Sequence, residues 1–126
     1  MTGAQVLVVE DNERNMKLFR DVLHASGYGT IEATTGERAV ELVIEHRPDL
    51  VLMDFQLPDI DGVEALDRLR ADERTASVPV LALTAQAMEG DRERFLAAGF
   101  DGYLSKPVNI ADLVATVTRY CEGRRP

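Results

Sequence analysis

Short apolar runs alternate along the whole chain with longer segments in which apolar residues recur at helical spacing. The apolar runs predict strands at residues 5–9, 29–33, 49–53, 79–83 and 101–104. The segments between them predict helices at residues 13–26, 36–46, 62–71, 90–98 and 109–121. Regular alternation of strand and helix is typical of repeated βα units. We therefore expect an α/β fold with a doubly wound, five-stranded parallel sheet.

The first predicted helix has the clearest amphipathic pattern. The residues expected on its buried face are Leu18, Phe19, Val22 and Leu23. Charged residues occupy the remaining positions, so one side of this helix can cover the sheet. Met16 lies at the edge of the apolar face, where we favour packing over a contact with a partner protein.

Length and composition indicate one ordinary globular domain. The chain has 126 residues, of which 45% are hydrophobic and 29% charged, a composition typical of soluble folded proteins. We expect a single module, 1–126, with a core from about residue 5 to 121. No long apolar segment or signal peptide is visible, so we expect a cytoplasmic protein without a membrane contact.

Charge and cysteine content exclude further classes. The formal net charge of -8 argues against nucleic acid, because binding to phosphates depends on Lys and Arg. Cys121 is the one cysteine, so no internal disulfide forms, and no cluster of Cys and His offers a zinc site. We expect Cys121 to be a half-buried helix residue.

Acidic residues follow two of the apolar strands. Glu10 and Asp11 follow residues 5–9, and Asp54 follows residues 49–53. In open α/β sheets the ligand site lies beyond the carboxyl ends of the strands, which is where these acids would meet. Crowded carboxylates oppose ionisation unless a positive group holds them. The pattern therefore predicts a divalent cation, Mg²⁺, held by Asp11 and Asp54 with Glu10 close by.

Thr84 and Lys106 follow the fourth and fifth predicted strands and complete a polar set at the same edge. Asp54 is the best candidate nucleophile, because a carboxylate can attack phosphorus and form an aspartyl phosphate. Lys106 would be the cationic partner of that phosphate. Thr84 could donate its hydroxyl to a phosphoryl oxygen.

Four motifs in this order and spacing resemble the receiver domain of two-component response regulators. They are Val9-Glu10-Asp11-Asn12, Met53-Asp54-Phe55-Gln56-Leu57-Pro58-Asp59-Ile60-Asp61-Gly62, Leu83-Thr84-Ala85 and Ser105-Lys106-Pro107. The resemblance covers about residues 5 to 121. Residues 11–19, 53–58 and 84–88 look closest to single-domain regulators of the DivK type.

The resemblance implies a flavodoxin-like fold with strand order 2-1-3-4-5 and five flanking helices. It also implies Mg²⁺ bound through Asp11, Asp54 and the backbone carbonyl of Gln56, with Glu10 acting mainly through water. Tyr103 would turn inward when Thr84 moves toward a phosphate on Asp54. The peptide bond between Lys106 and Pro107 is expected to be cis.

The function implied is a phosphorelay signalling switch. A histidine kinase or a histidine phosphotransfer protein would phosphorylate Asp54, and the chain would signal by docking on a downstream kinase or adaptor protein. Such a protein is not an enzyme for a small substrate, since it catalyses only its own phosphorylation and dephosphorylation. A monomer or a weak homodimer is expected.

Three other functions fit parts of the pattern. A haloacid-dehalogenase-like phosphohydrolase also uses an Asp nucleophile and Mg²⁺, but places it after the first strand. A flavin or nucleotide binder needs a phosphate loop where Glu10 and Asp11 stand. A docking module on the same fold would work without phosphorylation.

Single residues of the set also have structural alternatives. Glu10 and Asp11 could cap the first helix, where acids are favoured. Thr84 could likewise be a helix cap, and Lys106 a structural counter-ion of the acids. Tyr103 could be a static surface aromatic residue instead of a switch.

Overall fold

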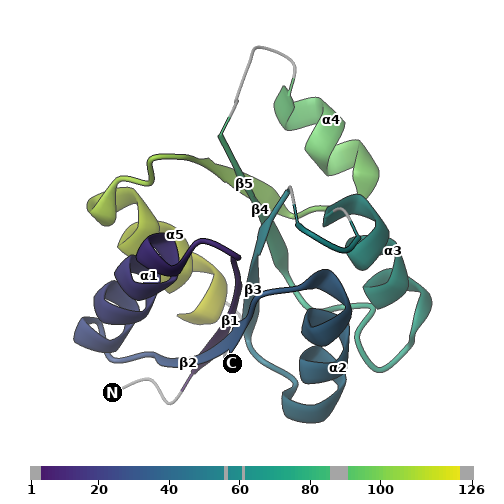
Figure 1. Cartoon of the computed structure of the whole chain (residues 1–126), viewed down its shortest axis with the longest axis horizontal. Coiled ribbons are helices and arrows are strands. Elements are labelled where there is room, and N and C mark those ends of the chain that lie inside the picture. The colour runs from purple at the N-terminus through teal and green to yellow at the C-terminus, as the bar shows by residue number, and fades with distance from the viewer. Residues whose placement is uncertain (1–3, 56, 61, 86–90, 123–126) are drawn as a thin grey trace.

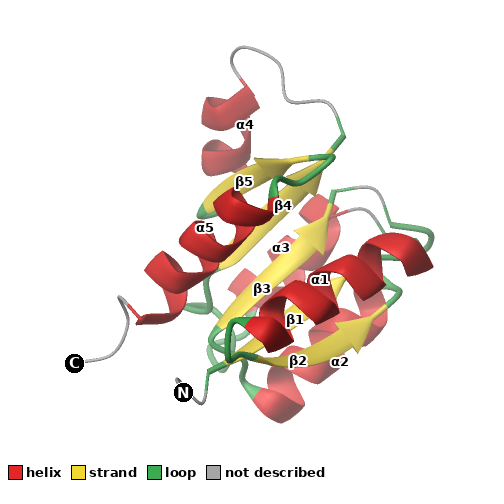
Figure 2. Ribbon diagram, turned by 90° about the vertical axis from the view of Figure 1, so that its left-hand side faces the viewer, coloured by secondary structure: helices red, strands yellow, loops and turns green. Residues whose placement is uncertain are grey.

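A computed structural model describes residues 4–55, 57–60, 62–85 and 91–122, without the side chains of residues 91, 92 and 122. Its strands are β1 (Gln5–Val9), β2 (Gly29–Ala33), β3 (Leu50–Asp54), β4 (Val80–Thr84) and β5 (Gly102–Ser105). They form one parallel sheet in the order β2-β1-β3-β4-β5, and Figure 2 shows the strands pointing the same way. The predicted topology is confirmed.

Helices cover both faces of the sheet. They are α1 (Glu13–Ala25), α2 (Gly36–His46), α3 (Gly62–Ala71), α4 (Asp91–Ala98) and α5 (Ile110–Glu122). Helices α1 and α5 lie on one side, and α2, α3 and α4 lie on the other (Figure 1). This is the doubly wound arrangement that alternating strands and helices predict. None of the helices in the described part of the chain is long and apolar enough to cross a membrane.

Strands β3, β4 and β5 begin and end one residue later than the sequence predicts. Asp54 pairs with Leu83 across the ladder, and Thr84 pairs with Ser105. The two polar residues are therefore the last residues of their strands and not the first residues of loops. Their backbones are fixed by the sheet, so their side chains start from defined positions at its carboxyl edge.

Alternating residues of the central strands fill two separate apolar layers. Leu7 and Val9 pack with α2 and α3, whereas Val6 and Val8 pack with α1 and α5. A strand buried on both faces needs apolar residues at every position. This is why β1, β3 and β4 read as continuous Val and Leu runs.

The buried face of α1 differs from the predicted one. Met16, Phe19 and Leu23 are buried, at helical spacings of three and four residues. Leu18 is 38% exposed, so its assignment to the core was wrong, and the packing role of Met16 is confirmed. Cys121 on α5 is fully buried in the same layer, so the prediction of a half-buried residue was also wrong.

The segment that follows Asp54 is attached to α2. Asp59 accepts hydrogen bonds from the backbone N–H groups of Gly36 (2.8 Å) and Glu37 (3.0 Å), beside the N-cap residue Thr35. A Cβ atom on Gly36 would lie 2.5 Å from a side-chain carbon of Ile60. A larger residue at position 36 would therefore force Ile60 to move. The bonds to Asp59 attach the connection between β3 and α3 to the first turn of α2.

We expect Asp59→Ala to cost about 1 to 2 kcal/mol of stability, because it leaves helix N–H groups without their carboxylate. Burial raises the pKa of Asp59, but the backbone N–H donors outweigh it and hold the pKa below the usual 3.8. Because the pKa of Asp59 is lower in the folded state, its ionised carboxylate stabilises the fold above pH 3.8. This contribution is lost as the pH falls below 3.8 and through the folded-state pKa. Denaturant unfolding at pH 7 and near pH 3 should show a smaller loss from the mutation in acid. Asp67→Ala, on an exposed site of α3, is the control and should change stability by less than about 0.5 kcal/mol.

Candidate functional site

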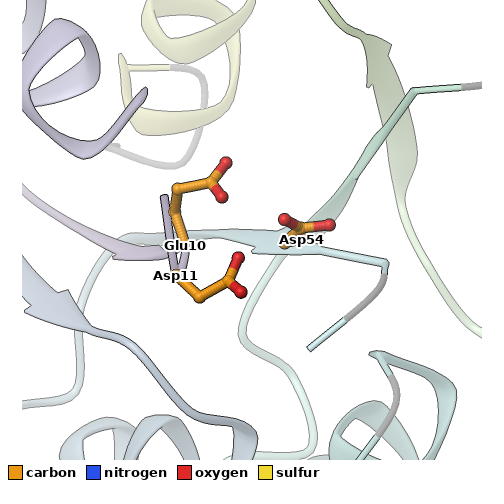
Figure 3. A group of neighbouring side chains, drawn as sticks. All are labelled: Glu10, Asp11 and Asp54. Carbon is orange, nitrogen blue, oxygen red and sulfur yellow. The ribbon is translucent and has the colours of Figure 1, made fainter. Parts of the chain in front are cut away.

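Three carboxylates gather at the carboxyl edge of the sheet. Glu10 and Asp11 directly follow β1, and Asp54 ends the neighbouring strand β3. One oxygen atom from each lies within 4.8 Å of the others, and Figure 3 shows Asp11 and Asp54 reaching toward one another with Glu10 beside them. These are the three acids that the sequence pattern predicts to meet. Parallel pairing of β1 with β3 brings them together.

Lys106 joins two of the acids. Its Nζ atom lies 2.8 Å from Asp54 Oδ2 and 2.7 Å from Glu10 Oε1. Burial lowers the pKa of the Lys106 ammonium, but the hydrogen bonds to Asp54 and Glu10 outweigh it and raise the pKa above its usual value. Lys106 is thus charged. It is a counter-ion of Glu10 and Asp54, which was one of the two roles that its position in the sequence allowed.

The hydrogen-bonding between β4 and β5 continues past the end of β5 to Lys106. Its N–H group donates to the carbonyl of Thr84 at 2.7 Å, directly beyond the pairing of β4 with β5. The peptide bond between Lys106 and Pro107 is cis, as expected. The hydrogen bond to Thr84 and the pairing of β4 with β5 fix the backbone from which Lys106 reaches Asp54.

Glu10 is the most buried of the acids, at 1% exposure. Its carboxylate accepts hydrogen bonds from the Asn12 backbone (3.2 Å) and the Asn15 amide (3.4 Å), besides its bond to Lys106. Burial raises the pKa of Glu10, an effect that the hydrogen bonds from Lys106 and Asn12 only partly offset. A buried acid of this kind needs a nearby cation.

The helix-cap interpretation of Glu10 and Asp11 is wrong. The N-cap of α1 is Asn12, whose side chain accepts from the Asn15 N–H group at 3.1 Å. Glu10 instead bonds to Asn12 and Lys106, and Asp11 is exposed beside the cleft. Both acids are therefore available for a role at the edge of the sheet.

A cleft of about 640 Å³ lies over this cluster. The polar and charged residues that line it are Glu10, Asp11, Asn12, Asn15, Asp54, Thr84, Arg94 and Lys106. Thr84 is buried, and Arg94 from α4 is a residue that the sequence patterns did not select. Gln56 lies outside the described residues, so its predicted backbone ligand stays a prediction.

Tyr103 lies on β5, beside the strand that ends in Thr84. It is half-buried, and its ring centroid is 5.5 Å from that of Phe95 on α4. The ring thus bridges β5 and α4. Its inward turn on phosphorylation stays a prediction.

The oxygen atoms of the cluster fit a small, hard cation. Mg²⁺ prefers carboxylate and carbonyl oxygens and keeps several waters, and Glu10, Asp11 and Asp54 offer three carboxylates around one point beside an open cleft. Among the described residues, this group consists of carboxylates alone, whereas a zinc site would be expected to include nitrogen or sulfur ligands.

A doubly wound sheet with an acid cluster and a lysine at its carboxyl edge defines a receiver domain. The response regulator receiver domain family matches residues 6–118, and the chain belongs to this family. It is 49% identical to the polar-differentiation response regulator DivK of Brucella anthropi over 115 residues, which cover 91% of the chain and 94% of that relative.

Solved structures are similar in the same way. The receiver domain of the sensor histidine kinase PA1611 from Pseudomonas aeruginosa, with a magnesium ion in its active-site cleft, has a TM-score of 0.87 and 39% identity. The match covers 95% of this chain and 98% of that one. The receiver domain of Ssk1 from Saccharomyces cerevisiae, crystallised with the phosphotransfer protein Ypd1, has a TM-score of 0.88 and 32% identity, over 95% and 90% of the chains.

Family membership decides between the functions that the sequence left open. The chain is a response regulator receiver domain of two-component signalling. The dehalogenase-like and flavin-binding alternatives are thereby set aside. A docking module that works without phosphorylation shares the receiver fold and needs a chemical test.

Proposed function

We propose that Asp54 accepts a phosphoryl group in a Mg²⁺-dependent reaction and that the phosphorylated chain signals by docking on other proteins. The observation that carries this proposal is the placement of the Lys106 ammonium, 2.8 Å from Asp54 and 2.7 Å from Glu10. A cation so placed can leave Asp54 for an incoming phosphoryl oxygen while Glu10 still holds it. The chain would catalyse no other reaction than its own phosphorylation and dephosphorylation.

The chemistry is a substitution at phosphorus. An oxygen of the Asp54 carboxylate attacks, a new O–P bond forms, and the bond from phosphorus to the donor's leaving atom breaks. For a phosphohistidine donor the leaving atom is an imidazole nitrogen. Lys106 would neutralise charge on the transferred group, and the hydroxyl of Thr84, which lines the same cleft, would donate to one of its oxygens.

Glu10, Asp11 and Asp54 would hold the metal, together with the predicted backbone carbonyl of Gln56. When bound, Mg²⁺ offsets the negative charge of the acids and of the phosphoryl group. The magnesium ion in the cleft of the PA1611 receiver supports this proposal.

The donor would be a histidine kinase or a histidine phosphotransfer protein, and the target a kinase or adaptor protein. The complex of Ssk1 with Ypd1 supports a phosphotransfer partner. The DivK relative, 94% of which is matched, is hardly longer than one receiver domain. We accordingly propose a single receiver domain with its core from about residue 5 to 121, acting in the cytoplasm as a monomer or weak homodimer.

The first test is incubation with acetyl phosphate, with and without Mg²⁺, followed by intact mass spectrometry. We expect a gain of one phosphoryl group that needs Mg²⁺ and that is absent in Asp54→Asn. Equal circular dichroism of the two proteins would show that the mutant keeps the fold. Labelling of Asp54→Asn would refute the assignment. If neither acetyl phosphate nor a phosphorylated histidine kinase labels the wild type, the phosphorylation-independent docking module is favoured.

Metal binding alone should stabilise the protein. Because Mg²⁺ would bind only the folded acid cluster, the free energy of unfolding should rise by about 1.4 kcal/mol for each tenfold increase of saturating Mg²⁺. Asp11→Asn should lose most of this dependence, since it removes one of three carboxylates. Thermal unfolding over a Mg²⁺ series checks this, with Asp67→Asn as a charge-matched control on α3. An unchanged response of Asp11→Asn would contradict the ligand assignment.

A further inference from the structure

Arg94 places a second cation on the acidic cleft. It comes from α4 and lines the cleft together with Asp54, Thr84 and Lys106. Its side chain is exposed, whereas Lys106 is 18% exposed. Lys106 thus lies at the floor of the cleft and Arg94 at its rim.

Two aromatic rings support the Arg94 guanidinium at this position. Its central carbon lies 5.2 Å from the ring centroid of Phe95 and 5.9 Å from that of Phe55. The two rings pack edge to face at 5.1 Å. A guanidinium is attracted electrostatically to the faces of aromatic rings. Arg94 and Asp54 line the same cleft, and the two rings hold the guanidinium there.

The two cations of the cleft differ in how they meet a ligand from solvent. The described charged residues that line the cleft are Glu10, Asp11, Asp54, Arg94 and Lys106. Lys106 contacts Glu10 and Asp54 inside the cleft. Arg94 is the more exposed of the two cations, so an anion that approaches from solvent meets its positive charge first.

We infer that Arg94 attracts and orients the anionic phosphoryl donor at the mouth of the Asp54 cleft. This inference rests on the proposed function of Asp54. A charge at the entrance of a cleft raises the local concentration of oppositely charged ligands and their association rate. The same positive charge opposes the binding of a cation to the acid cluster. Loss of Arg94 must therefore act in opposite directions on the anionic donor and on Mg²⁺.

The donor side is tested by the rate of labelling with acetyl phosphate in Arg94→Ala, Arg94→Glu and Arg94→Lys. At low salt and saturating Mg²⁺ we expect a rate lower by about 3- to 10-fold in Arg94→Ala. We expect a larger loss in Arg94→Glu and little change in Arg94→Lys. The differences should shrink near 1 M salt, where the Debye length is about 3 Å. Arg74→Ala is the matched control, because Arg74 is exposed, pairs with Asp72 and does not line the cleft.

The metal side is tested by calorimetric titration with Mg²⁺. We expect affinity to increase in Arg94→Ala and more so in Arg94→Glu. A merely structural role of Arg94 would weaken both labelling and Mg²⁺ binding, and that result would overturn the inference. Labelling that responds neither to the charge at position 94 nor to salt would also overturn it. A wild type that neither acetyl phosphate nor a phosphorylated histidine kinase labels would refute the proposed function. The titration needs no phosphorylation, so the Mg²⁺ affinities would still show whether the charge of Arg94 acts on the acid cluster.

Discussion

Lys106→Ala should accept phosphate from acetyl phosphate on the order of 100-fold more slowly than the wild type. The ammonium contacts Asp54 and Glu10 directly, at the point where the charge of the transferred group must be neutralised. Removal of one preorganised donor from an active site typically costs about 10²- to 10³-fold in rate. Time courses by intact mass at saturating Mg²⁺ measure this effect.

The structure supplies a close control for this substitution. Lys17 is the only other lysine of the chain, and it is exposed and paired with Asp21 on α1. Lys17→Ala changes the net charge equally and should label at the wild-type rate. A Lys106→Ala protein that labels as fast as Lys17→Ala would show that Lys106 is only a counter-ion of the acids.

Lys106→Ala affects both the rate of labelling and the stability of the fold, because the lysine also stabilises the unphosphorylated protein. Glu10 is 1% exposed in the intact protein, and without Lys106 its hydrogen-bond donors among the described residues are the neutral groups of Asn12 and Asn15. A buried charge that loses its partner is strongly destabilising, by about 3 to 5 kcal/mol where burial is complete. Labelling must therefore be measured at a temperature at which the mutant is folded, as judged by circular dichroism.

The fold was predictable because the central strands are buried on both faces. Burial requires continuous apolar runs, and these mark β1, β3 and β4 directly. Spacing alone could not give the order of the strands in the sheet, which came from the family resemblance. The ends of β3 and β4 were missed by one residue, since a polar residue that still pairs in the ladder looks like the start of a loop.

Helix faces were less certain because their patterns are ambiguous. Leu18 and Phe19 are adjacent, and helical spacing permits a buried stripe through either of them. The stripe passes through Phe19 because Met16 and Leu23 lie in line with it. That choice depends on which residues meet the sheet, and this is a property of the tertiary structure.

Site residues that follow strands could be predicted from the sequence. Site residues that come from helices or loops could not. Glu10, Asp11, Asp54 and Lys106 stand next to apolar strands, so topology gathers them. Arg94 reaches the cleft from a helix with no motif, and its position depends on the packing of Phe95. A hydrogen bond between elements that are distant in the sequence produces no local sequence pattern. The bonds from the first turn of α2 to Asp59 are a second example.

Arg70→Ala should lower the free energy of unfolding by about 2 to 4 kcal/mol without changing the acceptor site. At the end of α3 the guanidinium donates to four oxygens, which belong to Ala76 (3.0 Å), Val78 (2.6 Å), Gly99 (3.1 Å) and Asp101 (2.9 Å). One side chain thus joins the connection before β4 to the connection before β5.

The large expected loss of stability has a physical reason, because the alanine would leave the Asp101 carboxylate without its guanidinium partner. Asp101 Oδ2 also accepts from the Val80 N–H group at 2.8 Å, so the carboxylate that orders the start of β4 would lose its cation. Hydrogen bonds to charged groups contribute about 1.5 to 3 kcal/mol each, and the four here share one side chain, so they do not add in full. Arg68→Ala, which removes exposed pairs with Glu64 and Glu37, should cost less than about 1 kcal/mol.

The position of Arg70 makes the result informative about function. Its partners lie at or before the amino ends of β4 and β5, whereas Asp54, Thr84 and Lys106 lie at or just beyond the carboxyl ends of strands. Well below the melting temperature, the Arg70→Ala protein should therefore take up phosphate at a rate within about twofold of the wild type, since sites without shared partners act independently. Equal stability of Arg70→Ala and Arg68→Ala in urea would contradict the joining role. A large loss of labelling in a folded Arg70→Ala protein would instead mean that the two edges of the sheet are coupled through β4.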